Sequence, residues 1–447
     1  MTDRPTVHIV HCIDTEGPLY ESLSATFERL REIFGLELEP TQENLIRLQR
    51  REIDLGGRED SVARVLAPEL LNYNSTWDQV DRMLDSAMSP EFRNRLTDSF
   101  GGGWIYNWHC IDHVGYTANP RRRDMGFHNV FDHYRDTLRR TRSPQDGIHF
   151  HHHPLSFTRE GHRSATHYFA HTPMIFEILA RRIIERKWFP CVNRPGFHTT
   201  RPDSHWLMEQ YIPFDYASQA TAADDSTQKD VAGGRFGDWR RAPQTWTPYH
   251  PDVDDYQVEG GCRRWIARCL NIAGRVRALT DKDVEDAFRE AQSGRPAVLS
   301  FTDHDFRDLR PDVDLARSMI SRAAAKYPNV AFRFCEGRDA LRRALGIAAR
   351  PPVRFAMSID DGRLAIEADA PIFGPQPFLA IRTRSGQYHH DNLDFQTPFR
   401  SWSYSFDDNT VPLDALESIG VGACDATGNV TVSVLDGRTG KLHTTHH

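Results

Sequence analysis

Residues 7–18 read VHIVHCIDTEGP, and this stretch predicts where the fold begins and where its chemistry lies. The run Val7–Ile13 is short, apolar and rich in β-branched residues, which is typical of a buried strand. It leads to two acidic residues, Asp14 and Glu16, and then to a Gly-Pro turn signal. Acidic residues at the carboxyl end of a strand occupy the place where α/β enzymes keep their reactive groups.

Further short apolar runs alternate with helical patterns along the first 350 residues. Those that we interpret as strands are Trp104–Ile111, Gly147–Phe157, Phe189–Arg194, Ile212–Tyr216, Ala297–Thr302 and Val330–Phe334. Apolar residues at three- and four-residue spacing predict helices elsewhere, most extensively over residues 22–96. Strands that alternate with helices indicate a largely parallel sheet, and the length of the chain favours closure into a (β/α) barrel.

The pattern changes near residue 351. From Val353 onward, short alternating strands are separated by turn signals such as Asp361-Gly362 and Ser385-Gly386. A chain of 447 residues is also longer than one hydrophobic core usually supports. We therefore predict an α/β barrel with long insertions over residues 1–350 and a small all-β domain over residues 351–447.

The composition is that of an ordinary water-soluble protein, with 39% hydrophobic and 26% charged residues. No apolar run is long enough to span a bilayer, and the N-terminus does not resemble a signal peptide. The seven cysteines are scattered without a CxxC pair, which favours reduced thiols in the cytoplasm. The net charge of −7 gives no general attraction to nucleic acid, so we expect no such partner. A homo-oligomer stays an open alternative.

Residues 149–154 read HFHHHP, the densest group of imidazoles outside the C-terminal tail. In a strand, His149 and His153 are about 13 Å apart and cannot share one metal, whereas His151 and His153 can. In a helical turn, residues four apart approach to about 5–6 Å between Cβ atoms, which favours His149 with His153. The spacing alone leaves both pairings open, but the cluster itself predicts a metal site.

Three protein ligands and a water are the usual set around a catalytic zinc, so one more ligand is expected, and a carboxylate is the best candidate. Asp14 and Glu16 are two apart on a strand and point to the same side, so one can bind the metal while the other acts as a base. Arg194 ends another strand and could pair with a carboxylate. His304 ends a further strand between two aspartates, which favours a proton donor whose charged form is supported.

These residues resemble the motifs of the polysaccharide deacetylase superfamily, also called NodB-like or carbohydrate esterase family 4. Its first motif, a strand ending in two acidic residues and Gly, resembles residues 14–17 with one residue inserted; its second, two histidines before Pro, resembles residues 147–154. The third, Arg followed by Pro, resembles Arg194-Pro195-Gly196, and the fifth, a strand leading to a catalytic histidine, resembles residues 298–304. The resemblance covers about residues 6–335, and residues 17–148 form a far longer insertion than simple members carry.

The resemblance implies a distorted barrel of the NodB-like type and a metal-dependent hydrolase that removes an acetyl or other acyl group from an amino sugar or polysaccharide precursor. By carry-over, Glu16, His149 and His153 hold a divalent metal, with zinc expected. Asp14 is the general base, Arg194 its partner and His304 the general acid. Two alternatives remain: a deformylase or other amidohydrolase at the same site, or a catalytically silent sugar-binding module of the same fold.

Four tryptophans are candidates for stacking on a sugar ring near the mouth of the barrel, although tryptophans more often pack in a core. They are Trp104, Trp108, Trp239 and Trp246.

Overall fold

The computed structural model describes residues 4–153, 159, 172–222, 236–274 and 276–447. Seven parallel strands close into a barrel in the order β1-β2-β3-β4-β5-β6-β7, and β7 pairs with β1. Their bounds are β1 Thr6–Thr15, β2 Tyr106–Cys110, β3 Gly147–His152, β4 Val192–Pro195, β5 Phe214–Ser218, β6 Trp265–Asn271 and β7 Ala297–His304. This architecture confirms the predicted α/β barrel with a C-terminal all-β region.

The long first strand makes the closure possible because it pairs with three neighbours. Along one side it pairs with β7 over residues 7–14. Along the other, its first half pairs with β8 (Ala331–Phe334) and its second half with β2. The barrel is therefore splayed at the amino end of β1 and closed at the carboxyl end.

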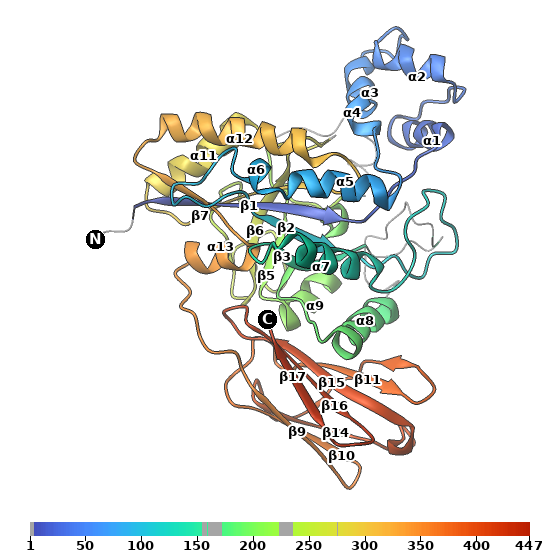
Figure 1. Cartoon of the computed structure of the whole chain (residues 1–447), viewed down its shortest axis with the longest axis vertical. Helices are drawn as coiled ribbons and strands as arrows, with labels where there is room; N and C mark the ends of the chain where they lie inside the picture. The colour runs from blue at the N-terminus through green and yellow to red at the C-terminus, as the bar shows by residue number, and fades with distance from the viewer. Residues whose placement is uncertain (1–3, 154–158, 160–171, 223–235, 275) are drawn as a thin grey trace.

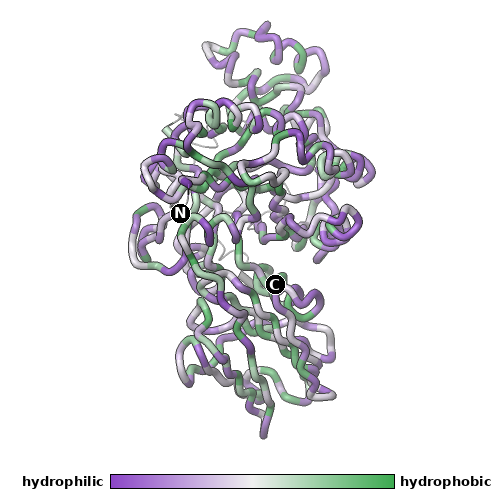
Figure 2. Tube along the Cα trace, turned by 60° about the vertical axis from the view of Figure 1, so that its left-hand side comes forward, coloured by the Kyte–Doolittle hydropathy of each residue, from purple (hydrophilic) through white to green (hydrophobic). Residues whose placement is uncertain are grey.

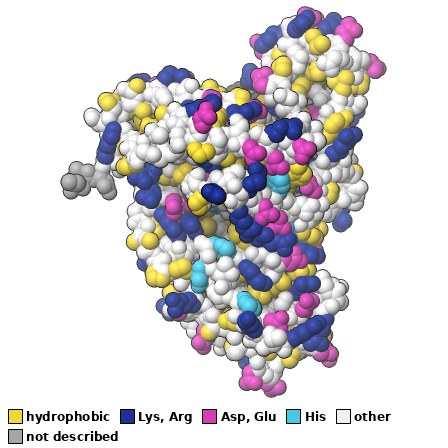
Figure 3. Space-filling model, viewed as in Figure 1, with side chains coloured by type: hydrophobic (Ala, Val, Ile, Leu, Met, Phe, Trp, Pro, Cys, Tyr) yellow, Lys and Arg dark blue, Asp and Glu magenta, His cyan; other side chains and the backbone are white. Residues whose placement is uncertain are grey.

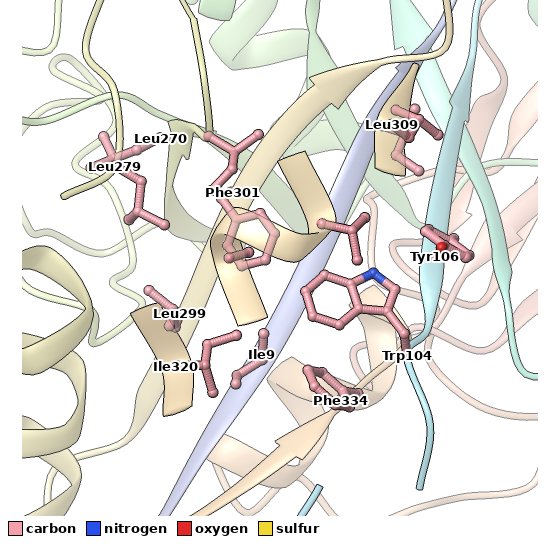
Figure 4. Packing of buried hydrophobic residues seen from close by; sticks show 14 of the residues in the cluster. Ile9, Trp104, Tyr106, Leu270, Leu279, Leu299, Phe301, Leu309, Ile320 and Phe334 are labelled. Atoms are coloured by element: carbon pink, nitrogen blue, oxygen red, sulfur yellow. The ribbon is translucent and has the colours of Figure 1, made fainter. Parts of the chain in front are cut away.

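Both faces of β1 are apolar for most of its length because helices cover the outside and side chains fill the inside. Val7, Ile9 and Ile13 belong to the outer hydrophobic cluster, where Ile9 lies near Trp104 and Phe334 (Figure 4). The inward residues of the same strand include Val10 and Cys12, which belong to the second cluster. Figure 2 shows hydrophobic residues along the central strands.

Helices follow most of the barrel strands. They are α7 (Asn129–Thr141), α8 (Thr172–Arg181), a π-helical turn (Arg182–Arg186), a 3₁₀ turn (Gly196–His198), α9 (Pro202–Tyr211), α11 (Asp281–Gln292), α12 (Leu309–Lys326) and α13 (Gly337–Ala344). The insertion after β1 adds α1 (Leu23–Phe34), α2 (Gln42–Gln49), α3 (Glu59–Val65), α4 (Pro68–Leu71), α5 (Trp77–Ala87) and α6 (Pro90–Arg93). The first four of these have their own small core and form a lobe beyond the carboxyl end of β1 (Figure 1).

Strand β6 is absent from the sequence prediction, which assigned no strand between Ile212–Tyr216 and Ala297–Thr302. Arg268 interrupts its apolar run. The structure places this side chain outside the barrel, where Nε donates to the carbonyl of Ala220 at 2.6 Å and Nη2 lies 2.8 Å from Asp283 Oδ1. A paired, hydrogen-bonded arginine is therefore tolerated in a buried strand.

The C-terminal part forms two antiparallel sheets. One contains β9 (Phe355–Asp360), β10 (Arg363–Ala368), β13 (Asp394–Thr397) and β14 (Ser401–Ser405); the other contains β11 (Phe378–Thr383), β12 (Tyr388–His389), β15 (Leu416–Cys424), β16 (Val430–Asp436) and β17 (Leu442–His446), with a 3₁₀ turn at Leu413–Ala415. The five-stranded sheet shares a hydrophobic cluster with the barrel, where Ile183 and Phe189 belong with Phe378 and Val432. The boundary at residue 350 stays a prediction.

Among the described residues, no helix is long and apolar enough to cross a membrane. All seven cysteines lie within the described residues and are buried free thiols. Figure 3 shows acidic and basic side chains intermixed over one face of the molecule.

Candidate metal centre and active site

The predicted site residues gather at one end of the barrel because every barrel strand runs in the same direction. Asp14 is the second-last residue of β1 and Glu16 directly follows the strand, and the register pairs Asp14 with His304 of β7. On the other side, His151 of β3 is in register with Arg194 of β4. Parallel strands thus bring four distant segments of the chain to one rim, which is the end of the barrel where barrel enzymes carry their catalytic residues.

Glu16, His151 and His153 each present a ligand atom, and these three atoms lie within 4.8 Å of one another. Nε2 of His151 is 2.9 Å from Nε2 of His153, and the latter atom is 3.6 Å from Oε1 of Glu16. Ligands about 2.0–2.1 Å from a tetrahedral zinc lie about 3.4 Å apart. The two spacings of 2.9 and 3.6 Å are close to that value and the third is at most 4.8 Å, so the donor set fits a divalent cation after small shifts of the side chains.

A hydrogen bond at Nδ1 sets the tautomer of His151. Nδ1 lies 2.6 Å from the backbone carbonyl oxygen of Arg194, which can only accept, so Nδ1 carries a proton and donates. In the neutral ring this leaves the lone pair on Nε2, the atom that faces His153 and Glu16. A ring oriented by a backbone carbonyl in this way is the usual support of a metal-ligating histidine.

His149 does not join this group, in contrast to the ligand set implied by the family resemblance. It lies on β3 two residues before His151, deeper in the barrel, because the segment is a strand and not a helical turn. Its Nε2 is 3.1 Å from Oε1 of Glu336 and 3.1 Å from Oδ1 of Asn107. The structure thus brings together the strand-type pair, His151 with His153. Pro154, the last residue of the motif, lies outside the described residues.

We expect His149→Ala to destabilise the protein without removing metal. The change leaves the partly buried carboxylate of Glu336, whose side chain is 16% exposed, without its imidazole partner, and losing such a partner typically costs about 1–3 kcal/mol of the free energy of unfolding. Thermal unfolding should show a lower Tm, and elemental analysis should show unchanged metal content. His149→Gln keeps a donor near Glu336 and should lose less stability. Loss of metal at an unchanged Tm would contradict the assignment of His149 to the barrel interior.

Asp14 lies between a cation and an imidazole. Its Oδ2 is 2.7 Å from Nη1 of Arg194 and 3.5 Å from Nε2 of His304, and its Oδ1 is 3.7 Å from Nδ1 of His151. Burial raises the pKa of Asp14 well above its ordinary value, while the guanidinium of Arg194 opposes that shift. A carboxylate with a raised pKa is a stronger base near neutral pH, which suits proton abstraction from water.

His304 faces the site, but the two aspartates beside it in sequence do not face its ring. Asp303 accepts the backbone N–H of His304 at 2.7 Å. Asp305 accepts the backbone N–H groups of Glu16 and Gly17 at 2.9 and 2.8 Å. Burial, together with Arg307 and Arg194, lowers the pKa of His304 well below its ordinary value. A lowered pKa favours the neutral ring at rest, and the two flanking aspartates give its charged form no direct contact.

Two further residues position the metal-site carboxylate, and the sequence analysis missed both roles. Asp305 holds the turn after β1 through the two backbone hydrogen bonds given above and a third from the hydroxyl of Tyr134. Arg123, from the long insertion, pairs its Nη2 with Oε2 of Glu16 at 2.6 Å. No local pattern marks an arginine more than one hundred residues away as a neighbour of Glu16. In the sequence, Asp305 drew attention only because it directly follows His304.

The four tryptophans considered for sugar stacking are all buried. Trp104 and Trp108 belong to the outer hydrophobic cluster with Trp246, and Trp239 packs in a separate small cluster. Each is at most 1% exposed, so none can present a face to a sugar ring.

Comparisons with known proteins leave the family open. No family model matches the sequence, and no curated protein matches it. A search of solved structures found a double mutant of an endo-β-1,4-mannanase from Cellulomonas fimi, at 10% identity and a TM-score of 0.26, covering 77% of this chain and 86% of the mannanase chain. A likeness at that score carries no argument about function. The resemblance to polysaccharide deacetylases therefore depends on the motif residues and their arrangement.

Proposed function

We propose that the protein is a metal-dependent hydrolase that removes an acetyl or other acyl group from the nitrogen of an amino sugar or a glycan precursor. One observation carries the proposal: a carboxylate and two imidazoles converge within 4.8 Å beside an Asp14–Arg194 ion pair and His304, all on the carboxyl rim of a parallel barrel. Three protein ligands leave a coordination position for water, the plan of a catalytic rather than a structural zinc site. The resemblance to deacetylases supplies the class of substrate.

Glu16, His151 and His153 would hold the cation, in place of the set with His149. When bound, a divalent cation there polarises an acyl carbonyl and makes an attacking water more acidic. Arg123 and Asp305 fix the carboxylate and backbone of Glu16, and the carbonyl of Arg194 fixes the ring of His151. Such support keeps ligands in the geometry that binding requires, so less free energy is lost in ordering them.

The remaining groups provide a path for one proton. Asp14 takes a proton from the attacking water, and Arg194 holds this carboxylate in place and balances its charge. Nε2 of His304, 3.5 Å from Oδ2 of Asp14, then receives the proton and passes it to the nitrogen of the departing amine. This order agrees with the lowered pKa of His304, because the ring gains its charge only after the base has been protonated. Asp14 is thus the base and His304 the acid, as the resemblance implies.

The test is turnover by the zinc-loaded full-length protein on acetylated amino sugars, measured as release of free amine. N-formylated sugars and simple acetamides in the same panel distinguish a deformylase or a general amidohydrolase. His389→Ala replaces an exposed histidine of β12 and serves as a control, since it should keep full activity. Metal binding without release of amine from any of these substrates would favour the silent sugar-binding module over the enzyme.

A further inference from the structure

Arginines from the segments that follow β2 and β7 lie near the rim that carries Glu16. The backbone N–H of Tyr20, in the loop after β1, donates to the carbonyl of Arg121 at 2.9 Å, which fastens the segment 121–123 to that loop. Arg123 then reaches Glu16. The ring of Phe306 lies close to two of these arginines. Its centre is 5.1 Å from the guanidinium carbon of Arg123 and 4.9 Å from that of Arg307.

Arg123 has donor capacity that its ion pair does not use. The residue is 8% exposed, and only its Nη2 contacts Glu16. Its Nε and Nη1 are buried and have no hydrogen-bond partner among the described residues. A buried charged donor left unsatisfied is costly and calls for an explanation, and beside the candidate site an anionic ligand that completes its hydrogen bonds is such an explanation. Phe306, which Arg123 overlies, has its ring 4.6 Å from that of His304, so these donors border the reaction site.

Positive charge is also in excess beside Arg123. Arg29 and Arg121 share the carboxylate of Glu21, whose side chain is 1% exposed. The contact from Arg121 Nη2 to Glu21 Oε2 is a loose 3.6 Å, because Arg29 holds the same oxygen more closely. Burial lowers the pKa of Arg121 to about 10, and repulsion from Arg29 and Arg123 adds to the shift. An anion bound between Arg121 and Arg123 would remove this repulsion.

We propose that the substrate carries an anionic group, a phosphate or a carboxylate, that binds between the guanidinium groups of Arg123 and Arg121 at the rim of the metal site. This inference rests on the proposed function and narrows its substrate class from any acylated amino sugar to an acidic one. Guanidinium groups suit this task because they stay charged and present planar sets of donors that match both oxyanions. The site lies within reach of the metal site because Arg123 contacts Glu16 directly.

A matched pair of ligands tests the proposal: N-acetylglucosamine and N-acetylglucosamine 1-phosphate, titrated calorimetrically into the zinc-loaded full-length protein. The phosphorylated sugar should bind more tightly than the neutral one. Arg121→Gln should weaken the binding of the phosphorylated sugar about 10- to 100-fold, the range for a lost hydrogen bond to a charged group.

Arg121 is a better residue to replace than Arg123, because Arg123→Gln also disturbs the proposed metal ligand Glu16. Arg384→Gln, an exposed arginine in the C-terminal sheets, is the control and should change nothing. N-acetylmuramic acid in a parallel titration distinguishes a carboxylate from a phosphate.

Equal affinity for the neutral and the phosphorylated sugar would overturn the proposal. A phosphate preference that survives in Arg121→Gln would also overturn it, because the metal and not the arginine pair would then hold the anion. Both results concern binding alone, so neither depends on turnover. The proposed function fails separately, if no acyl group is released from either kind of sugar by protein that binds them.

Discussion

Replacing His151 with alanine should leave the protein with little or no bound metal and reduce its activity to background. His151 supplies one of three donor atoms, and its ring is already held by a hydrogen bond to the carbonyl of Arg194. Loss of an outer-shell partner alone typically weakens metal affinity about 10- to 100-fold, and loss of a ligand should exceed that. His153→Ala should behave in the same way. Elemental analysis after dialysis measures the metal content.

The metal contents of His151→Ala and His149→Ala together show which of the two histidines binds the metal. His149 and His151 are both buried histidines two residues apart on β3, so they differ in partners rather than in surroundings. Metal retained in His151→Ala and lost in His149→Ala would mean that the segment adopts a helical turn when metal binds. The strand-type site would then be wrong, and the ligand set implied by the family resemblance would stand.

Asp14→Asn should lower kcat by about 10²- to 10⁴-fold, the usual effect of losing a general base. The amide cannot accept the proton of water, while its size is unchanged. Asp14 lies outside the group of Glu16, His151 and His153, so metal content should be retained. KM should change little, because the proton transfer is made in the transition state. A variant that keeps full activity would show that Asp14 only balances the charge of Arg194.

The dependence of rate on pH tests the same step. A general base works only when ionised, so activity is present above its pKa and is lost as the pH falls through it. Because burial raises the pKa of Asp14, that acidic limb should lie above the ordinary carboxyl range near about 4, and Asp14→Asn should remove it. Because burial and nearby arginines lower the pKa of His304 well below its ordinary value near about 6.5, activity should not fall as the pH rises through that value. A loss there would mean that His304 must start protonated.

The sequence alone predicted the barrel and the rim at which the candidate site residues gather. Alternating apolar strands and helices can bury their faces in few ways, and parallel strands bring their carboxyl ends together. Asp14, Glu16, Arg194 and His304 were therefore found from local patterns. The β6 strand was missed because Arg268 breaks its pattern, and only the neighbours outside the barrel show why that charge is tolerated.

The tertiary structure decided which histidine lies beside His153. Spacing allowed His149 or His151 to join His153, and the extended conformation of β3 selects His151 because residues two apart share a face at short range. The role of Arg123 could not be read from the sequence, since its contact with Glu16 spans a long insertion. The protonation state of His304 also depends on which charges fold around it, and the nearest ones in sequence turn away. Local pattern determined which residue types stand at the rim, and long-range packing decided which of them meet.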